Sequence, residues 1–131
     1  METKTLEYSY EIIDEYKIIK VTVLGNLTTQ EAAIMGIMVR VKANEMGYKL
    51  FFDYTLLSSI KIAIGDAYFW FSDHYDTINT KLRHIPTALL VNEKDKSSFD
   101  FFENTCYNKG IRIRIFRENK NALEWLNQIK N

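Results

Sequence analysis

Polar residues gather where one apolar segment of the sequence ends. Asp53 closes the segment 48–53, and ligands of open α/β sheets collect at the carboxyl ends of such strands. The downstream loop adds hydroxyl groups and a Gly-Asp pair. We therefore predict a ligand site made of Asp53, Tyr54, Thr55, Ser58, Gly65 and Asp66. Asn26, Asn92 and Arg117 are expected at the same rim. The competing interpretation is that these side chains stabilise turns and satisfy loop amides.

Nucleophiles and metal ligands are poorly supported by the pattern. Cys106 is expected on the apolar face of a helix and near its C-terminus, where the helix dipole disfavours a thiolate. His74 has Trp70 and Ile78 at the positions four residues away, so it lacks the second ligand of a helical metal pair. Phosphate-loop and dinucleotide-loop patterns are absent from the sequence. We predict no catalytic residues, no metal and no cofactor, and hence no enzyme.

Two sets of residues are candidates for a protein interface. The segment 28–46 has apolar side chains around half of its circumference or more, including Met35 and Met38. Phe69 and Trp70 fall off the apolar stripe of the expected helix 66–82, and such aromatic residues are enriched at interfaces. Two alternatives stay open: a deeply covered first helix, and packing of Phe69 and Trp70 under the loop 54–64.

A row of arginines is expected on the last strand, at Arg112, Arg114 and Arg117. It can either block edge-to-edge pairing of the sheet or bind an anion or a partner.

Composition limits the class of protein. The 131 residues favour a single domain, residues 1–131, with an ordinary soluble composition. The 17 basic and 17 acidic residues cancel, which argues against a nucleic-acid partner. One cysteine excludes an internal disulfide, and no apolar run is long enough for a signal peptide or a membrane span. We predict a cytoplasmic protein without integral membrane association.

The expected elements begin with a hairpin, residues 7–13 and 17–24, in which apolar and polar residues alternate. Thr28 and Glu31 match a capping box, and Gly47 is placed to end the helix. Three more strands and three more helices follow; the expected ranges are 48–53, 66–82, 87–91, 98–109, 111–115 and 119–129. The segment 54–64 is either an irregular loop or a short extra strand.

This order, β-β-α-β-α-β-α-β-α, predicts an α/β fold with a mixed five-stranded sheet and four helices. It resembles the STAS domain, and within it the SpoIIAA-like branch of mostly uncharacterised proteins. Four segments carry the resemblance across nearly the whole chain: YSYEIIDEYKIIKVTVLGNLTTQE, LFFDY, PTALLVNEKDKSSFDFF and GIRIRIFRENKNALEWL.

The resemblance implies a regulatory module, with one departure. The anti-sigma-factor antagonists of this superfamily carry an Asp-Ser/Thr-Ser-Gly pattern whose serine is phosphorylated. Here the corresponding residues are Ile62, Ala63, Ile64 and Gly65, so the glycine is present and the hydroxyl is not. We therefore predict a non-enzymatic protein-interaction module that forms a homodimer and binds an unknown protein partner. The alternative is a domain that binds a small ligand or a lipid at the rim near Asp53.

Overall fold

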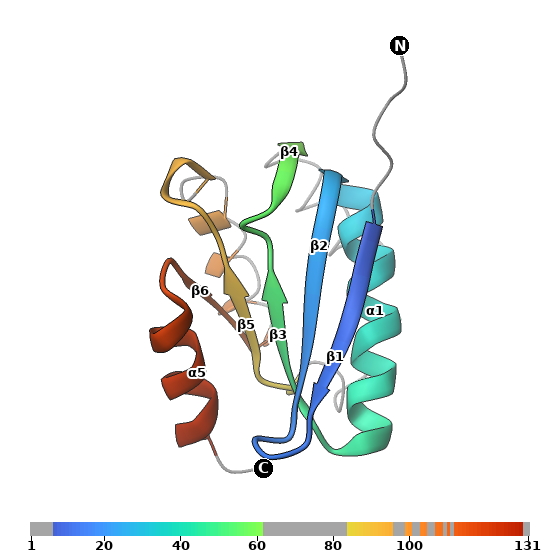
Figure 1. Ribbon diagram of the computed structural model, residues 1–131, viewed down its shortest axis with the longest axis vertical. Coiled ribbons are helices and arrows are strands. Elements are labelled where there is room, and N and C mark those ends of the chain that lie inside the picture. Colours follow the sequence, from blue (N-terminus) through green and yellow to red (C-terminus); the bar gives the residue numbers. More distant parts are fainter. Residues whose placement is uncertain are drawn as a thin grey trace.

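The computed structural model describes residues 7–61, 84–95, 99–100, 103–104, 107–108, 110 and 112–129. Two long helices flank a twisted sheet (Figure 1). The strands are β1 Glu7–Ile13, β2 Ile18–Thr28, β3 Lys49–Asp53, β4 Leu57–Lys61, β5 Thr87–Leu90 and β6 Ile113–Phe116. The helices are α1 Thr29–Met46, the short 3-10 helix η2 Glu93–Asp95, and α5 Asn119–Gln128.

The sheet has the strand order β1-β2-β3-β5-β6, with β1 antiparallel to β2 and the other neighbours parallel. This confirms the predicted mixed five-stranded sheet. A sixth strand, β4, pairs in parallel with the C-terminal end of β2. Of the two alternatives for residues 54–64, the short extra strand is therefore the one that forms. The second strand therefore does not end at residue 24 as predicted. It continues to Thr28 through an irregularity at Gly25 and Asn26, where the positive φ of Gly25 suits glycine.

The prediction of four helices is corrected to two α-helices, α1 and α5, within the described residues. The predicted helix 66–82 lies outside those residues. The predicted helix 98–109 is described only at residues 99–100, 103–104 and 107–108, which are helical.

Local chemistry sets the limits of α1. The Thr28 hydroxyl accepts a hydrogen bond from the Glu31 N–H at 3.2 Å and donates one to the Glu31 carboxylate at 3.1 Å. The predicted cap is therefore present. The Glu31 carboxylate, however, accepts from the Thr28 hydroxyl and not from the Thr28 backbone N–H that a capping box would use. Gly47 ends the helix in the left-handed conformation at φ 71°.

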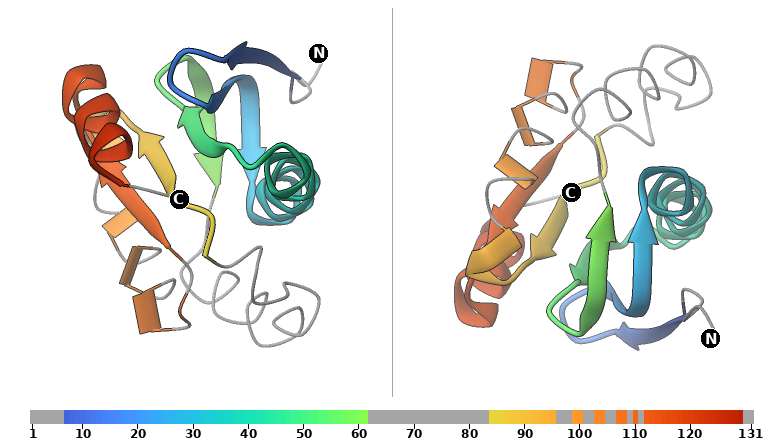
Figure 2. Two further views of the ribbon diagram at one scale, coloured as in Figure 1. Left: turned by 90° about the horizontal axis from the view of Figure 1, so that it is seen from below. Right: turned by 90° about the horizontal axis from the view of Figure 1, so that it is seen from above.

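The core lies on both faces of the sheet, because consecutive residues of β3 point to opposite sides. Leu50 and Phe52 pack in the cluster that contains α1, while Phe51 packs with Ala122 and Leu126 of α5. Figure 2 shows α1 and α5 on opposite faces of the sheet. β3 is therefore a central strand with an apolar cluster on each side.

Phe51→Ala should lower the free energy of unfolding by about 3–5 kcal/mol, because it leaves a cavity under α5. Urea denaturation followed by circular dichroism measures the loss. Tyr107→Ala is the control, since Tyr107 is 82% exposed and its truncation should change stability by less than about 0.5 kcal/mol. Equal effects of the two changes would contradict the two-sided core.

Candidate functional site

The predicted rim at the end of β3 is built as a turn. One carboxylate oxygen of Asp53, Oδ1, accepts from the Thr55 N–H at 2.9 Å and from the Thr55 hydroxyl at 2.6 Å. Asn92 then donates its side-chain N–H to the Thr55 carbonyl at 2.9 Å, which ties the end of β5 to this turn. One carboxylate oxygen of Asp53 and the side-chain N–H of Asn92 are thus used within the chain, as in the turn interpretation.

Tyr54 does not line this rim, and its predicted role in ligand binding is corrected. It is 5% exposed and its ring stacks on Phe99, with ring centroids 5.6 Å apart. Burial raises the pKa of the Tyr54 phenol well above its usual value, while the charge of Arg40 acts in the opposite direction. Tyr54 belongs to the core, where its ring contacts Phe52 of β3 and Phe99.

The other predicted ligand residues are less fully placed. Ser58 lies in β4, where the backbone is described and the side chain is not. Gly65 and Asp66 lie outside the described residues, as do the candidates His74 and Cys106.

The two methionines of the predicted interface have different environments. Met35 is 2% exposed and packs in the core, so it is corrected from an interface residue to a core residue. Met38 is 54% exposed on the outer side of α1. Phe69 and Trp70 lie outside the described residues.

Arg40 is a buried cation that the sequence patterns did not single out. It is 8% exposed, and its guanidinium donates to the Thr87 hydroxyl at 3.3 Å and to the Gly36 carbonyl at 3.4 Å. Thr87 begins β5, so this contact joins α1 to a strand that is distant in sequence. Only the absence of a side chain at Gly36, four residues earlier, hinted at the space that Arg40 fills.

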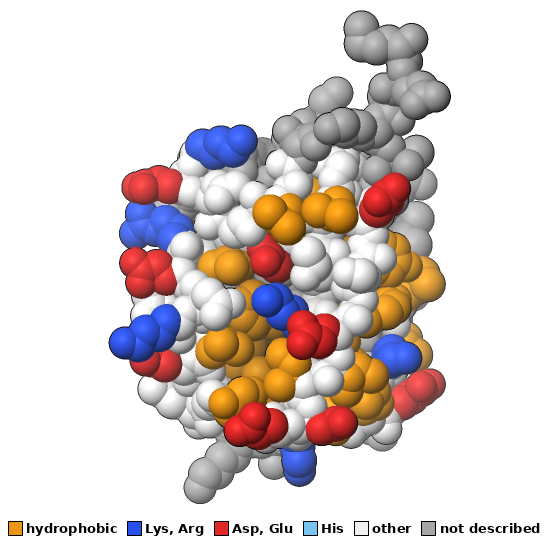
Figure 3. Space-filling view, in the orientation of Figure 1, with side chains coloured by type: hydrophobic (Ala, Val, Ile, Leu, Met, Phe, Trp, Pro, Cys, Tyr) orange, Lys and Arg blue, Asp and Glu red, His pale blue; other side chains and the backbone are white. Residues whose placement is uncertain are grey.

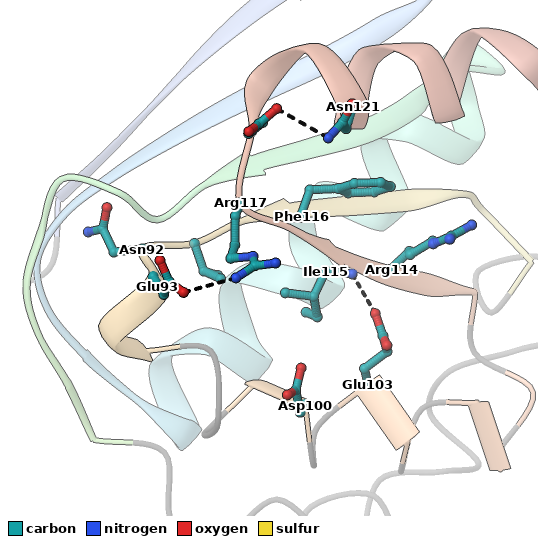
Figure 4. Close-up of a pocket in the computed structure, with 11 residues that line it drawn as sticks. Asn92, Glu93, Asp100, Glu103, Arg114, Ile115, Phe116, Arg117 and Asn121 are labelled. Carbon is teal, nitrogen blue, oxygen red and sulfur yellow. Dashed lines mark hydrogen bonds and ion pairs between the residues drawn. The ribbon is translucent and has the colours of Figure 1, made fainter.

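A polar hollow of about 700 Å³ lies beside the ends of β5 and β6 (Figure 4). Arg117 crosses it to form an ion pair with Glu93 at 3.1 Å. Asp100 and Glu103 approach from the helical residues on the other side. The lining residues are Val91, Asn92, Glu93, Asp100, Glu103, Arg114, Ile115, Phe116, Arg117, Glu118 and Asn121. Asn92 and Arg117 were expected at a rim, whereas Asp100 and Glu103 come from a distant segment that no local pattern connects to it.

At the β6 edge of the sheet, a side chain accepts an outward backbone N–H. The Thr87 backbone N–H donates to the Arg112 carbonyl, and the Val91 backbone N–H donates to the Phe116 carbonyl. The backbone hydrogen-bonding groups of the even-numbered residues in β6 therefore point toward β5. Ile115 therefore points its N–H outward, and the Glu103 carboxylate accepts it at 2.6 Å. The neighbouring Arg112 and Arg114 are exposed, which fits the interpretation of edge protection.

An apolar surface extends over β1 and α1. We define the β1–α1 surface by Tyr8, Tyr10, Ile12, Met38 and Val41, all of which are exposed. Figure 3 shows hydrophobic side chains gathered over α1 at the right of the molecule.

Contacts within this surface order its aromatic rings. The rings of Tyr8 and Tyr10 lie edge to face with centroids 5.5 Å apart, and the Lys42 ammonium lies 5.8 Å from the Tyr10 ring centre. Partial burial and the neighbouring Tyr8 hydroxyl raise the pKa of the Tyr10 phenol above its usual value. The surface therefore presents ordered aromatic rings beside α1.

The described residues contain neither a metal-binding cluster nor a membrane-spanning helix. None of their His, Cys, Asp and Glu side chains form a group of three or more that could hold a metal ion. None of their helices is long and apolar enough to cross a membrane.

Comparison with solved structures identifies the fold. An uncharacterised protein from the DUF3478 family of Shewanella loihica PV-4, with a SpoIIAA-like fold, matches 96% of this chain and 97% of its own, at 12% identity and TM-score 0.56. An anti-sigma factor antagonist from Mycobacterium paratuberculosis matches 93% of this chain and 94% of its own, at 10% identity and TM-score 0.57. This chain therefore has a SpoIIAA-like fold. No protein-family model matches the sequence, and no curated protein matches it significantly.

Asp53→Ala should lower the free energy of unfolding by about 1–2 kcal/mol, because it removes the acceptor of two hydrogen bonds from Thr55. Asp53→Asn keeps an acceptor oxygen and should cost less. Thermal and urea unfolding of the three proteins test this order. A rise in stability on removal of Asp53 would instead indicate a residue kept for ligand binding at the expense of stability.

Proposed function

We propose that this chain is a non-enzymatic regulatory module that acts through protein contacts and forms a homodimer. The observation that carries the proposal is the β1–α1 surface, where three β1 side chains and two α1 side chains are exposed together. Exposed apolar groups that gather on one face of a soluble fold typically mark a site of association. The likeness to an anti-sigma factor antagonist supports the same class, although a shared fold does not itself transfer a function.

The proposed mode of action differs from a phosphorylation switch of the STAS type. The sequence has Ile62, Ala63 and Ile64 where that switch has hydroxyl residues. We propose that regulation depends instead on which protein covers the apolar surface. A cytoplasmic location is part of the proposal, since one cysteine in the chain fits a reducing compartment.

The polar hollow beside β6 favours a second candidate function, the binding of a small ligand. Its walls carry carboxylates and two arginines, so it suits a polar ligand better than the acyl chain of a lipid. The hollow shares Asn92 and Arg117 with the predicted rim, but Asp53 does not line it.

Met38→Glu should weaken binding of a host protein to this chain by about tenfold or more, because it puts a charge into the apolar surface. The measurement is quantitative affinity capture from the native host, with the wild-type chain and each variant as bait. Leu56→Glu is the matched control, since Leu56 is 57% exposed and lies outside the β1–α1 surface. Captured proteins that respond equally to both changes, or to neither, would count against the proposal.

Arg117→Ala should abolish stabilisation by an anionic ligand that pairs with Arg117 in the hollow, because it removes the cation beside Glu93. A thermal-shift screen of small polar metabolites finds such ligands. Arg112→Ala is the matched control, since Arg112 is exposed and does not line the hollow. An anionic ligand whose shift survives in Arg117→Ala does not pair with Arg117 and contradicts this prediction.

A further inference from the structure

The two edges of the main sheet differ in how they are protected. The β6 edge has an outward N–H taken by Glu103, with arginines beside it. The β1 edge is a regular strand of seven residues, with six exposed and one half-buried. It has no proline and no bulge against β2, and its only charged residues are Glu7 and Glu11. Within the described part of the chain, β1 pairs with β2 alone. Long regular edges of this kind pair readily with another strand.

The pairing pattern shows which backbone groups of β1 are directed outward. The Lys17 carbonyl accepts from the Lys49 N–H, so the backbone hydrogen-bonding groups of Lys17 point toward β3. The direction of these backbone groups alternates along a strand. Those of Ile18, Lys20, Thr22 and Leu24 therefore point toward β1. Their partners in the register are the odd-numbered residues of β1. The outward N–H and carbonyl groups therefore belong to the even-numbered residues Tyr8, Tyr10 and Ile12.

One antiparallel register brings β1 into full contact with a second β1. When Tyr10 lies opposite Tyr10 of the other copy, all seven residues of the strand find a partner. The remaining opposed pairs are Tyr8–Ile12, Ser9–Glu11 and Glu7–Ile13. The outward residues then face one another in three hydrogen-bonded pairs, and no two like charges are directly opposed.

The neighbouring registers are less favourable. Pairing centred on Ser9 sets Glu7 opposite Glu11, and pairing centred on Glu11 sets that carboxylate opposite itself. Like charges directly opposed across strands are destabilising. Registers centred on Tyr8 or Ile12 leave most of the seven residues without a partner. The charge pattern of β1 thus selects the register centred on Tyr10.

The side chains of this register complete an apolar contact. Tyr8, Tyr10 and Ile12 lie on the face of the sheet that α1 covers, because they pair with core residues of β2. A second copy would set Tyr10 against Tyr10 and each Tyr8 against an isoleucine. Aromatic and β-branched pairs are among the favourable cross-strand pairs.

We propose that β1 pairs antiparallel with β1 of a second copy, centred on Tyr10, so that the two sheets become one continuous sheet. The proposal rests on the homodimer of the proposed function and assigns its site and register. The two copies are related by a two-fold axis that passes beside Tyr10, and each contributes the same surface.

Disulfide trapping tests the register. Ser9→Cys, Tyr10→Cys and Glu11→Cys are made separately in full-length chain that carries Cys106→Ser. Only residue 10 faces itself, at a Cα separation of about 5.5 Å that suits a disulfide. Tyr10→Cys should therefore form a covalent dimer fastest under mild oxidation. Faster trapping through residue 9 or residue 11 overturns the register.

Sedimentation velocity over a range of concentrations tests the pairing itself. Tyr10→Arg sets two cations directly opposite each other and should weaken the dimer about tenfold or more. Ser9→Lys sets a lysine opposite each Glu11 and should strengthen the dimer by about two- to tenfold. Tyr107→Arg is the matched control and should leave association unchanged, since Tyr107 is exposed and lies far along the chain from β1. Circular dichroism checks that each variant is folded.

The results separate this inference from the proposed function. A dimer that is insensitive to Tyr10→Arg and resists trapping through residue 10 overturns the β1 pairing but leaves a homodimer of another geometry. A wild-type chain that stays monomeric overturns both the pairing and the homodimer. Capture of host proteins that depends on Met38 would still support the regulatory module in that case.

Discussion

Burial of β3 on both faces is the constraint on which the arrangement of this protein depends. Leu50, Phe51 and Phe52 are consecutive and almost fully buried, so the chain must supply an apolar layer on each side of the sheet. On one side α1 supplies Met35 and Val39, and on the other α5 supplies its own buried residues. Because β3 must be central, β1 and β6 become the edges. The positions of the polar hollow and of the β1–α1 surface follow from that order.

At the ends of the parallel strands, polar side chains form hydrogen bonds that stabilise the turns of the fold. Asp53 and Asn92 stand where ligands of α/β folds usually bind, yet their hydrogen bonds join Thr55 to its own turn and to β5. The polar hollow lies one strand further along, between β6 and the helical residues Asp100 and Glu103, where charges of both signs meet. The predicted rim and the hollow share Asn92 and Arg117, whereas Asp53 bonds to its own turn and does not line the hollow.

The two edges of the sheet differ in whether their outward backbone groups are already bonded. At β6, Glu103 takes the place of a neighbouring strand by accepting the Ile115 N–H. At β1, the outward groups of Tyr8, Tyr10 and Ile12 are placed for strand pairing, and their side chains extend the apolar face of α1. Protection at one edge limits sheet growth to the other edge, so the proposed pairing through β1 would give a closed dimer rather than a chain of copies.

The sequence by itself determined what depends on neighbouring residues. The Thr28 cap, the Gly47 stop, the hairpin and the doubly covered β3 all follow from spacing within one segment, because capping and periodicity are local. Tertiary structure decided what depends on distant segments. It placed Met35 inside and Met38 outside, buried Tyr54 against Phe99, joined Arg40 to Thr87, and extended β2 along β4. The wide apolar face of α1 does not reveal which of its residues will be buried. Likewise, the sequence around Glu103 does not reveal that its carboxylate will accept the Ile115 N–H at the edge of β6. Those outcomes are set by packing between elements that lie far apart in the chain.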